Sequence, residues 1–491
     1  MILWGDLHNH CGITYGFGSL ENALKIARSH LDFCSITGHA MWPDMYPRTE
    51  ETKFIVDFHN SGFEKLRNNW ESIRAEIARQ NSNELVTFQG YEMHSSKYGD
   101  HHFISPDDDF PLIYRNSPAE LVKDCKVRAI AIPHHIGYTP GYRGINWDLF
   151  EQSISPCVEV VSKHGCAMSE NSPYPYYHDM GPRDSRNTVY EGLRRNNKFS
   201  FLGSTDHHAG FPGSYQDGLT AVLAKEKTRE AIWQALLTGK TYAVTGDRIL
   251  CDFTINNHGL GETVHSDKRV ISCKIRGEYW ADKLVVYKNL KPIYAMCGEM
   301  AEPYLCKKYK LRIEMGWGNK EELTAWDGTV VTNGKILSAN TYWRGRSLLS
   351  PTNHDGKDTV VNEIDNHIAK ESDTEFAWHC ETVRNKSTLH AQTDAVVLEI
   401  QGEMNTEITV NVNGRSYKAT IEELLQHGIS WHQKQYHSEA VKIHSLIPEY
   451  NYIMNLEFED NSLSGTDVYH MEFSQKNGQW AFVSPIYATG E

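Results

Sequence analysis

Histidines and carboxylates recur at short spacings in the first half of the chain, and fourteen of its 25 histidines fall before residue 210. The segment WGDLHNHCG, residues 4–12, places His8 and His10 two positions apart, with Asp6 just before them. Side chains at positions i and i+2 of a strand share one face, so both imidazoles can reach a single ion. We expect Asp6 to orient one imidazole rather than to bind metal itself. Such a pair alone is also common on polar surfaces, so the rest of the chain must decide.

Further metal-ligand side chains come at the ends of most short apolar runs in this half. They are His39 in ITGHA, Glu92 in GYEMH, His101 and His102 in GDHHFI, His134 and His135 in AIPHH, His164 in SKHG, and Asp206, His207 and His208 in STDHH. The carboxyl ends of parallel strands meet at one face of a barrel, so we expect these side chains to cluster. Buried imidazoles and carboxylates are costly when unpaired, and shared cations would satisfy them. The donor types suit two or three divalent ions (Zn, Mn or Fe), with Glu92 as the bridge.

The first 245 residues alternate short apolar runs with amphipathic segments. The predicted strands are residues 1–7, 31–37, 84–91, 129–133, 157–162 and 199–205, with a weaker one at 102–105. The predicted helices are residues 19–31, 63–80, 117–127, 185–197 and 228–238. This alternation favours a parallel α/β fold, either a barrel or a doubly wound sheet.

The pattern changes after Tyr242. Runs in residues 246–491 alternate apolar with polar side chains and are separated by turn sequences such as NNHG, VNGR and KNGQ. We therefore expect an antiparallel β domain that resembles a sandwich, with an irregular insertion near residues 321–374. Its tryptophans are expected to pack in the core, with sugar stacking as the alternative. They are Trp280, Trp317, Trp326, Trp343, Trp378, Trp431 and Trp480.

The order of DLHNH, ITGHA, GYE, DHHFI, AIPHH and GSTDHH resembles the PHP superfamily, the polymerase and histidinol phosphatase metallohydrolases. The resemblance covers roughly residues 1–245 and implies a distorted (β/α)7 barrel. The rest of the chain resembles an uncharacterised subgroup that carries a C-terminal β domain. The implied ligands are His8, His10, Glu92 and Asp206 for one ion, Glu92, His102 and His134 for a second, and His39 and His208 for a third. His101 and His135 remain alternatives to His102 and His134.

Two departures from the family pattern leave open whether a third ion binds. The second motif of the family usually has Asp before its histidine, whereas Gly38 precedes His39 here. A ligand that the family supplies several residues after His10 has no counterpart in CGITYGFG, although Asp44 could compensate.

Two neighbouring divalent ions lower the pKa of a bridging water and neutralise a phosphoryl centre. We therefore expect a metal-dependent hydrolase, with phosphate ester hydrolysis as the leading hypothesis. Asp206, His39 and His208 are the candidate catalytic residues. A protonated His39 or His208 would serve the leaving group where no third ion binds. The alternatives are hydrolysis of a sulfate ester, lactone or amide, and a non-catalytic, metal-stabilised binding module.

A small anionic substrate requires nearby cations. The candidates are Lys163, His164, Arg143, Arg183, Arg186 and Arg248, each of which also fits a surface salt bridge. Glu170 and residues 174–177 (YPYY) could form a pocket wall, or they could pack as an ordinary loop.

Composition excludes several other classes of protein. The net charge of −14 is spread along the chain, without the basic clusters of a nucleic-acid-binding protein. No apolar run approaches a membrane span, and MILWGDLHNH does not resemble a signal peptide, so we expect a cytoplasmic protein. The ten cysteines include no CxxC pair, and we expect them to be reduced and mostly buried.

Overall fold

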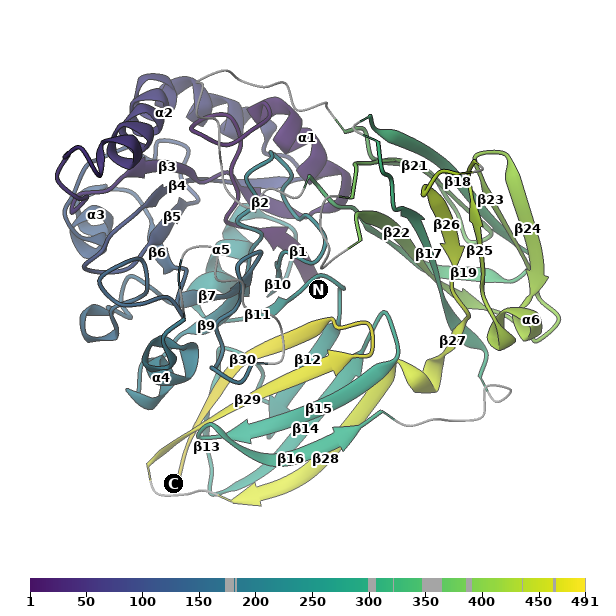
Figure 1. Ribbon diagram of the computed structural model, residues 1–491. Helices are drawn as coiled ribbons and strands as arrows, with labels where there is room; N and C mark the ends of the chain where they lie inside the picture. Colours follow the sequence, from purple (N-terminus) through teal and green to yellow (C-terminus); the bar gives the residue numbers. More distant parts are fainter. Residues whose placement is uncertain are drawn as a thin grey trace.

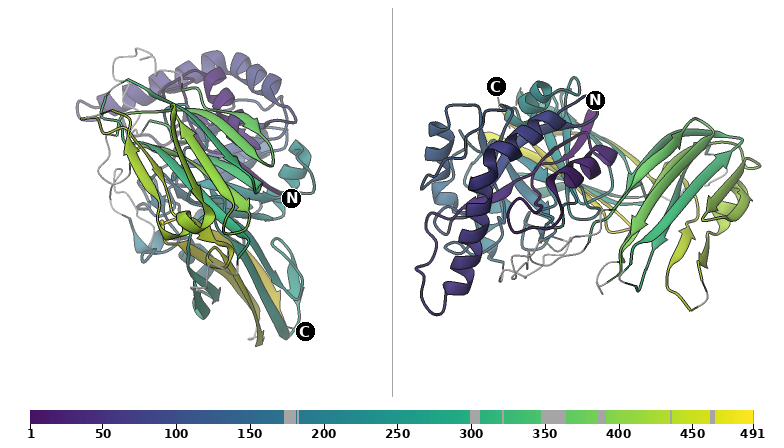
Figure 2. Two further views of the ribbon diagram at one scale, coloured as in Figure 1. Left: turned by 90° about the vertical axis from the view of Figure 1, so that its right-hand side faces the viewer. Right: turned by 90° about the horizontal axis from the view of Figure 1, so that it is seen from above.

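The computed structural model describes residues 1–172, 181, 183–298, 306–320, 322–346, 364–385, 391–434, 436–461 and 465–490. In Figure 1 the chain forms an α/β part from its first 245 residues, a two-layered β part beneath it, and a β-sandwich beside it. Figure 2 shows this sandwich projecting from the rest of the molecule. Within the described ranges, the helices are all too short or too polar to cross a membrane.

The α/β part supplies short strands with helices at their periphery (Figure 1). Its strands are β1 (Ile2–Asp6), β2 (Phe33–Ser35), β3 (Gly38–Met41), β4 (Val86–Met93), β5 (His101–Ser105), β6 (Ile130–Pro133), β7 (Cys157–Ser162), β8 (Gly165–Cys166), β9 (Ser200–Gly203), β10 (Leu219–Leu223) and β11 (Thr241–Val244). Its helices are α1 (Leu20–His30), α2 (Lys53–Gln80), α3 (Pro118–Asp124), α4 (Val189–Arg194) and α5 (Arg229–Leu237).

The strands and helices predicted for this part are present, with shifted ends. Ser19, Ser117 and Thr228 cap α1, α3 and α5, because each side-chain oxygen accepts a backbone N–H from the first turn. Helix α2 begins at Lys53, well before the predicted start, although Gly62 is a poor helix former. Gly62 is suited to this position because a Cβ there would lie 2.3 Å from the ring of Tyr15.

A closed, parallel (β/α)7 barrel is not shown by the strand pairing of the described residues. Strands β1, β2 and β4 run parallel, and so do β7 and β9. However, β10 is antiparallel to β1, and β5 is antiparallel to both β4 and β6. Residues 94–100 connect β4 to β5 and are too few for a crossover helix, so β5 turns back beside β4. The coarser prediction, a mixed α/β fold followed by a large β-rich region, is confirmed.

The main sheet continues from the α/β part into the C-terminal region. Its order is β16-β15-β29-β30-β11-β10-β1-β2-β4-β5-β6, and β30 pairs antiparallel with β11. A second sheet, β12-β14-β28, shares its hydrophobic core. The division at residue 245 therefore falls within a continuous sheet and stays a prediction. These strands are β12 (Leu250–Ile255), β13 (Thr263–His265), β14 (Lys268–Arg276), β15 (Ala281–Lys288), β16 (Lys291–Cys297), β28 (Ile453–Asn461), β29 (Thr466–Gln475) and β30 (Trp480–Thr489).

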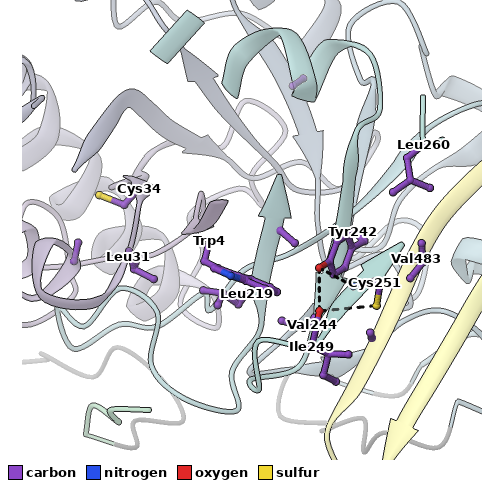
Figure 3. Packing of buried hydrophobic residues seen from close by; sticks show 14 of the residues in the cluster. Trp4, Leu31, Cys34, Leu219, Tyr242, Val244, Ile249, Cys251, Leu260 and Val483 are labelled. Carbon is purple, nitrogen blue, oxygen red and sulfur yellow. Dashed lines mark hydrogen bonds between the residues drawn. The ribbon is translucent and has the colours of Figure 1, made fainter. Parts of the chain in front are cut away.

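Figure 3 shows part of this shared core, in which Trp4 and Tyr242 pack near Ile249, Cys251 and Val483. The Tyr242 hydroxyl donates to the Ile249 carbonyl oxygen at 2.9 Å, so the one polar atom of the ring is satisfied. A large, mutually buried apolar surface of this kind favours a fixed arrangement of the α/β and C-terminal strands.

The sandwich consists of two facing sheets, ordered β19-β22-β17-β26-β25 and β20-β21-β18-β23-β24. Its elements are β17 (Lys308–Gly316), β18 (Thr324–Thr332), β19 (Lys335–Tyr342), β20 (His367–Glu371), β21 (Glu375–Thr382), β22 (Thr393–Gln401), β23 (Glu407–Val412), β24 (Arg415–Thr420), α6 (Ile421–Gln426), β25 (Ile429–His432), β26 (Ala440–Ile443) and β27 (Ile447–Pro448).

We expected an irregular insertion at residues 321–374. This prediction was wrong for much of that range, because it contains β18, β19 and β20. Residues 347–363 lie outside the described residues. Gly328 weakens the alternating pattern of β18, but the structure requires it because a Cβ there would lie 2.0 Å from the Trp378 ring. Trp326, Trp343 and Trp378 are fully buried, as expected of core residues. Nine of the ten cysteines are buried and only Cys297 is exposed, which confirms the expected burial.

Candidate metal centre

All eight predicted metal ligands are buried at one end of the α/β strands. His8 and His10 follow β1, His39 lies in β3, Glu92 in β4 and His102 in β5, His134 follows β6, and Asp206 and His208 follow β9. Backbone hydrogen bonds align two of these strand ends: the Asp206 N–H donates to the His8 carbonyl at 2.7 Å, and the His10 N–H donates to the His207 carbonyl at 2.8 Å. Asp206 has a φ of 49°, a left-handed conformation that side chains adopt reluctantly and that often marks functional sites.

The ligands implied for the first ion converge. His10 Nε2 lies 3.1 Å from Asp206 Oδ1 and 3.4 Å from Glu92 Oε2. His8 Nε2 is 3.2 Å from His10 Nε2 and 3.6 Å from both carboxylates. Two imidazoles and two carboxylates thus present their lone pairs to one small volume.

The other predicted ligands extend this cluster on either side of Glu92. On one side, His39 Nδ1 lies 2.9 Å from Glu92 Oε2, and His39 Nε2 lies 3.0 Å from His208 Nε2. On the other side, His134 Nε2 lies 3.1 Å from Glu92 Oε1, and the Nδ1 atoms of His134 and His102 are 3.3 Å apart. The carboxylate of Glu92 therefore contacts both groups, as expected of a bridging ligand.

The nitrogen-to-nitrogen contacts fit divalent ions. Ligand atoms 2.0–2.1 Å from a tetrahedral ion are about 3.3 Å from one another, close to the His8–His10 and His39–His208 separations. His39 Nδ1 faces the Glu92 carboxylate and His208 Nδ1 faces the Asp206 carbonyl oxygen. When both Nδ1 atoms carry the proton, the two Nε2 lone pairs face each other and an ion between them would relieve their repulsion. His102 Nε2 is also buried without a hydrogen-bond partner among the described residues, which is costly unless a cation satisfies it. The donor set therefore fits metal.

Protonation favours the same use of these groups. Burial lowers the pKa of His39 and of His208 well below the ordinary imidazole value, so both rings are neutral and keep a lone pair for an ion. Burial opposes ionisation of Glu92, but His39, His94 and His134 outweigh it and hold the pKa of this carboxyl well below its usual range. Glu92 is therefore a carboxylate.

Sequence reasoning missed Glu159, which lies in the middle of β7. Its Oε2 is 2.8 Å from His8 Nδ1, so it accepts the ring N–H and leaves Nε2 facing His10. Burial lowers the pKa of His8, but Glu159 and Asp206 outweigh it and raise this pKa well above its ordinary value. Without an ion the ring therefore holds both protons, and a bound ion would take the place of the proton on Nε2. A glutamate inside the apolar run CVEVVS was the signal that could have identified it.

A second missed group begins with His94, two residues after Glu92 and therefore on the same strand face. His94 Nε2 lies 3.1 Å from both His39 Nδ1 and the Tyr15 hydroxyl oxygen. Its Nδ1 lies 3.1 Å from Asp100 Oδ2. Tyr15 comes from CGITYGFG, the segment in which no ligand had been found.

Asp6 was expected to orient an imidazole, but it accepts backbone N–H groups, and Glu159 contacts the His8 ring instead. The Oδ1 atom of Asp6 accepts the N–H groups of His8 and Thr205 at 3.2 and 3.1 Å, and its Oδ2 accepts the Gly213 N–H at 2.9 Å. Burial raises the pKa of Asp6 to about 6. The residue connects β1 to the loop that carries Asp206.

Three of the six predicted substrate ligands lie at the cluster. Lys163 Nζ is 3.4 Å from His208 Nδ1, and His164 Nε2 is 2.9 Å from Asp206 Oδ2. Arg143 is largely buried, and its Nη1 is 3.4 Å from Asp100 Oδ2. Asp44, considered as a further ligand, instead accepts the backbone N–H groups of residues 96 and 97.

The other three arginines are engaged elsewhere. Arg183 donates to the carbonyl oxygens of Cys166 and Ser169, which fixes the loop after β8. Arg186 pairs with Asp184 in solvent. Arg248 donates to the His30 carbonyl and to Asn340, so it joins α1 to β19. Residues 174–177, which could form a pocket wall, lie outside the described residues.

The alternative histidines occupy different places. His101 Nδ1 donates to the Gly99 carbonyl oxygen at 2.8 Å, so His102 is the member of its pair that faces the cluster. His135 Nε2 lies 3.7 Å from Asp206 Oδ2 and has a left-handed φ of 54°. It therefore lies beside the Asp206 carboxylate, whereas His134 contacts Glu92.

Comparisons with known proteins identify relatives without an assigned activity. Residues 213–272 match the model of DUF3604, a family of proteins of unknown function. An uncharacterized protein of Chlamydia trachomatis serovar D is 24% identical over 286 residues, which cover 53% of this chain and 42% of that protein. An uncharacterized protein of Chlamydia pneumoniae is 28% identical over 137 residues, covering 26% of this chain and 22% of that protein. The chain thus spans less than half the length of these curated relatives.

Among solved structures, this chain is similar to a two-domain protein from Bacteroides vulgatus that contains a predicted PHP-like metal-dependent phosphoesterase. The two are 16% identical, with a TM-score of 0.33, over 58% of this chain and 79% of that chain. This similarity is too distant to establish a shared fold or activity.

Proposed function

We propose that this chain is a metal-dependent hydrolase of the PHP type that cleaves phosphate esters of a small anionic substrate in the cytoplasm. The strands that supply the ligands are, in this proposal, a distorted form of the (β/α)7 barrel. Two or three ions of Zn, Mn or Fe would be held by the eight buried ligands described above. The observation that supports this most strongly is Glu92, whose carboxylate lies within 3.6 Å of His8, His10, His39 and His134.

When bound, the ions would supply an activated water and neutralise charge on the phosphoryl oxygens. Asp206 would help His8 and His10 to hold one ion, and its Oδ2 would accept from His164 and so keep that ring oriented. The low pKa values of His39 and His208 favour their use as ligands over the storage of a proton for the leaving group.

Positive charge beside the cluster suits an anionic substrate. Lys163 and Arg143 approach from different loops, and Arg143 also lies 5.6 Å from the centroid of the Trp42 ring. We retain these two residues and His164 as candidate substrate ligands. Arg183 and Arg248 act structurally in this proposal, because backbone carbonyls already occupy their guanidinium groups.

The test combines metal content with turnover. Purified protein, its His10→Ala variant and a His258→Ala control, in which an exposed histidine is removed, are compared by elemental mass spectrometry. Each is then given p-nitrophenyl phosphate and the corresponding phosphodiester, sulfate and acetate. We expect two or three ions per chain and phosphatase activity in the wild type and the control, with both reduced in His10→Ala.

Other outcomes would change the proposal in defined ways. Turnover of the sulfate or acetate alone would replace the phosphoesterase with another hydrolase. Bound metal without turnover of any ester would favour the binding module. Less than one ion per chain in metal-replete protein would refute the metal centre itself.

A further inference from the structure

A cavity of about 700 Å³ lies between α4 and the strands β15, β29 and β30, and it shares no lining residue with the metal centre. Tyr190 of α4 forms one wall, and Tyr287, Glu472 and Trp480 come from the three strands. Figure 1 shows α4 beside β29 and β30. The volume of the cavity falls within the range of about 300–1,000 Å³ found for small-molecule sites.

A buried carboxylate is held in place at the wall of this cavity. Glu472 is 6% exposed, and its Oε1 accepts a hydrogen bond from the Tyr190 hydroxyl at 3.0 Å. His470 lies behind it, with Nε2 at 3.1 Å from the same hydroxyl oxygen and 3.7 Å from Glu472 Oε1. The His470 ring stacks on Tyr287 with centroids 4.6 Å apart. Glu472 is therefore preorganised as a hydrogen-bond acceptor.

Aromatic rings form much of the apolar part of the lining. Tyr287 is half-buried, and His470 covers one of its faces. The Tyr190 ring stands at 70° to it, with centroids 6.2 Å apart, so two walls meet at a steep angle. Trp480 is also half-buried and stacks with Phe482. Among the tryptophans considered for sugar stacking, Trp480 is thus placed differently from the fully buried ones.

Val285 and Leu290 add two aliphatic side chains. The other lining side chains are polar, and their charges balance. Arg194 and Lys283 are cationic, and Glu170 joins Glu472 as an anion. The short polar side chains are those of Ser169, Asn171, Ser185 and Thr188. Two cations disfavour an organic cation as the ligand, and two carboxylates disfavour an anion. Donors, acceptors and aromatic faces together suit a neutral ring that carries many hydroxyl groups.

We propose that this cavity binds a neutral saccharide. Glu472 accepts hydrogen bonds from sugar hydroxyls, and Tyr287 and Trp480 contact the apolar faces of the sugar rings. The proposal does not depend on the hydrolase function, because the cavity and the histidine cluster have no residue in common.

The full-length protein is titrated with maltose, cellobiose, lactose, mannobiose and N,N′-diacetylchitobiose by isothermal titration calorimetry. We expect saturable binding of at least one disaccharide, weakened about tenfold or more in Glu472→Gln, because a carboxylate acceptor is lost from a buried site. Trp480→Leu should weaken the same binding. Glu457→Gln, which removes an exposed carboxylate from β28, should bind as the wild type does.

Thermal unfolding with and without the disaccharide checks that the variants fold and repeats the comparison, since a ligand of the native state raises Tm. His10→Ala should retain saccharide binding, which separates this cavity from the metal centre. The proposal is overturned if none of the five disaccharides binds, or if Glu472→Gln and Trp480→Leu both bind like the wild type. Binding of tetramethylammonium that is lost in Glu472→Gln, in place of saccharide binding, would also overturn it.

Discussion

Replacement of Glu159 by glutamine tests how the metal centre is assembled. The Glu159 carboxylate lies 2.8 Å from His8 Nδ1, and the two side chains are 2% and 0% exposed. It is the acceptor that selects the tautomer with a proton on Nδ1 and a lone pair on Nε2. Glutamine keeps the size of the side chain but removes its charge, and its amide can also present an N–H to the ring. His8 then loses part of its orientation and basicity as a ligand.

The contact between Glu159 and His8 sets the expected loss of metal affinity. Loss of a carboxylate behind a metal-bound histidine lowers metal affinity by about 10–100-fold. That range corresponds to about 1.4–2.7 kcal/mol of binding free energy. The substitution should lower metal affinity more than it lowers the free energy of unfolding, because glutamine fills the same space in β7.

The assay is a competition titration of apo-protein with Zn²⁺ or Mn²⁺ against a chromophoric chelator of known affinity. A matched control is Glu314→Gln, because Glu314 Oε2 lies 2.6 Å from His444 Nε2 in the sandwich, far along the chain from the cluster. It removes the same charge from the same kind of pair. Wild-type affinity in Glu159→Gln, or an equal loss in Glu314→Gln, would refute the reasoning.

The remaining predictions concern other parts of the molecule. In Gly345→Ala the new Cβ would lie 2.6 Å from Phe211 Cβ and 2.7 Å from His207 Cε1. Urea titration should therefore show that the free energy of unfolding falls by about 1–3 kcal/mol. Gly259→Ala is the control, because the space around that Cβ is open and the free energy of unfolding should not change. Burial raises the pKa of Asp394 from 3.8 to about 7. The native state then holds a proton that the unfolded chain has released, so the free energy of unfolding should fall by up to about 4 kcal/mol between about pH 4 and pH 7. Asp394→Asn should flatten this slope in urea titrations across that range, and an unchanged slope would contradict the assignment. Lys163→Ala should weaken competitive inhibition by inorganic phosphate about tenfold, because a charged contact is lost, and equal weakening in Arg186→Ala would contradict a specific role for Lys163.

Local features of the fold were accessible from the sequence because neighbouring residues determine them. Ser19, Ser117 and Thr228 cap helices where their side chains can reach the first turn. The apolar runs became strands because burying them removes apolar surface from water. The direction of β5 was not accessible, because it depends on which strand is paired after a short connection.

The types and approximate order of the candidate metal ligands were likewise apparent from the sequence, because these residues recur at the ends of the apolar runs. Tertiary structure decided how they share roles. It placed Glu159 behind His8 across 151 residues of chain, and it assigned Arg183 and Arg248 to backbone carbonyls instead of the cluster. Spacing along the chain carries no information on such contacts, because distance in space between remote residues is fixed only when the strands pack. The same packing joined β11 to β30 and created the cavity at Glu472, which no segment of the sequence contains by itself.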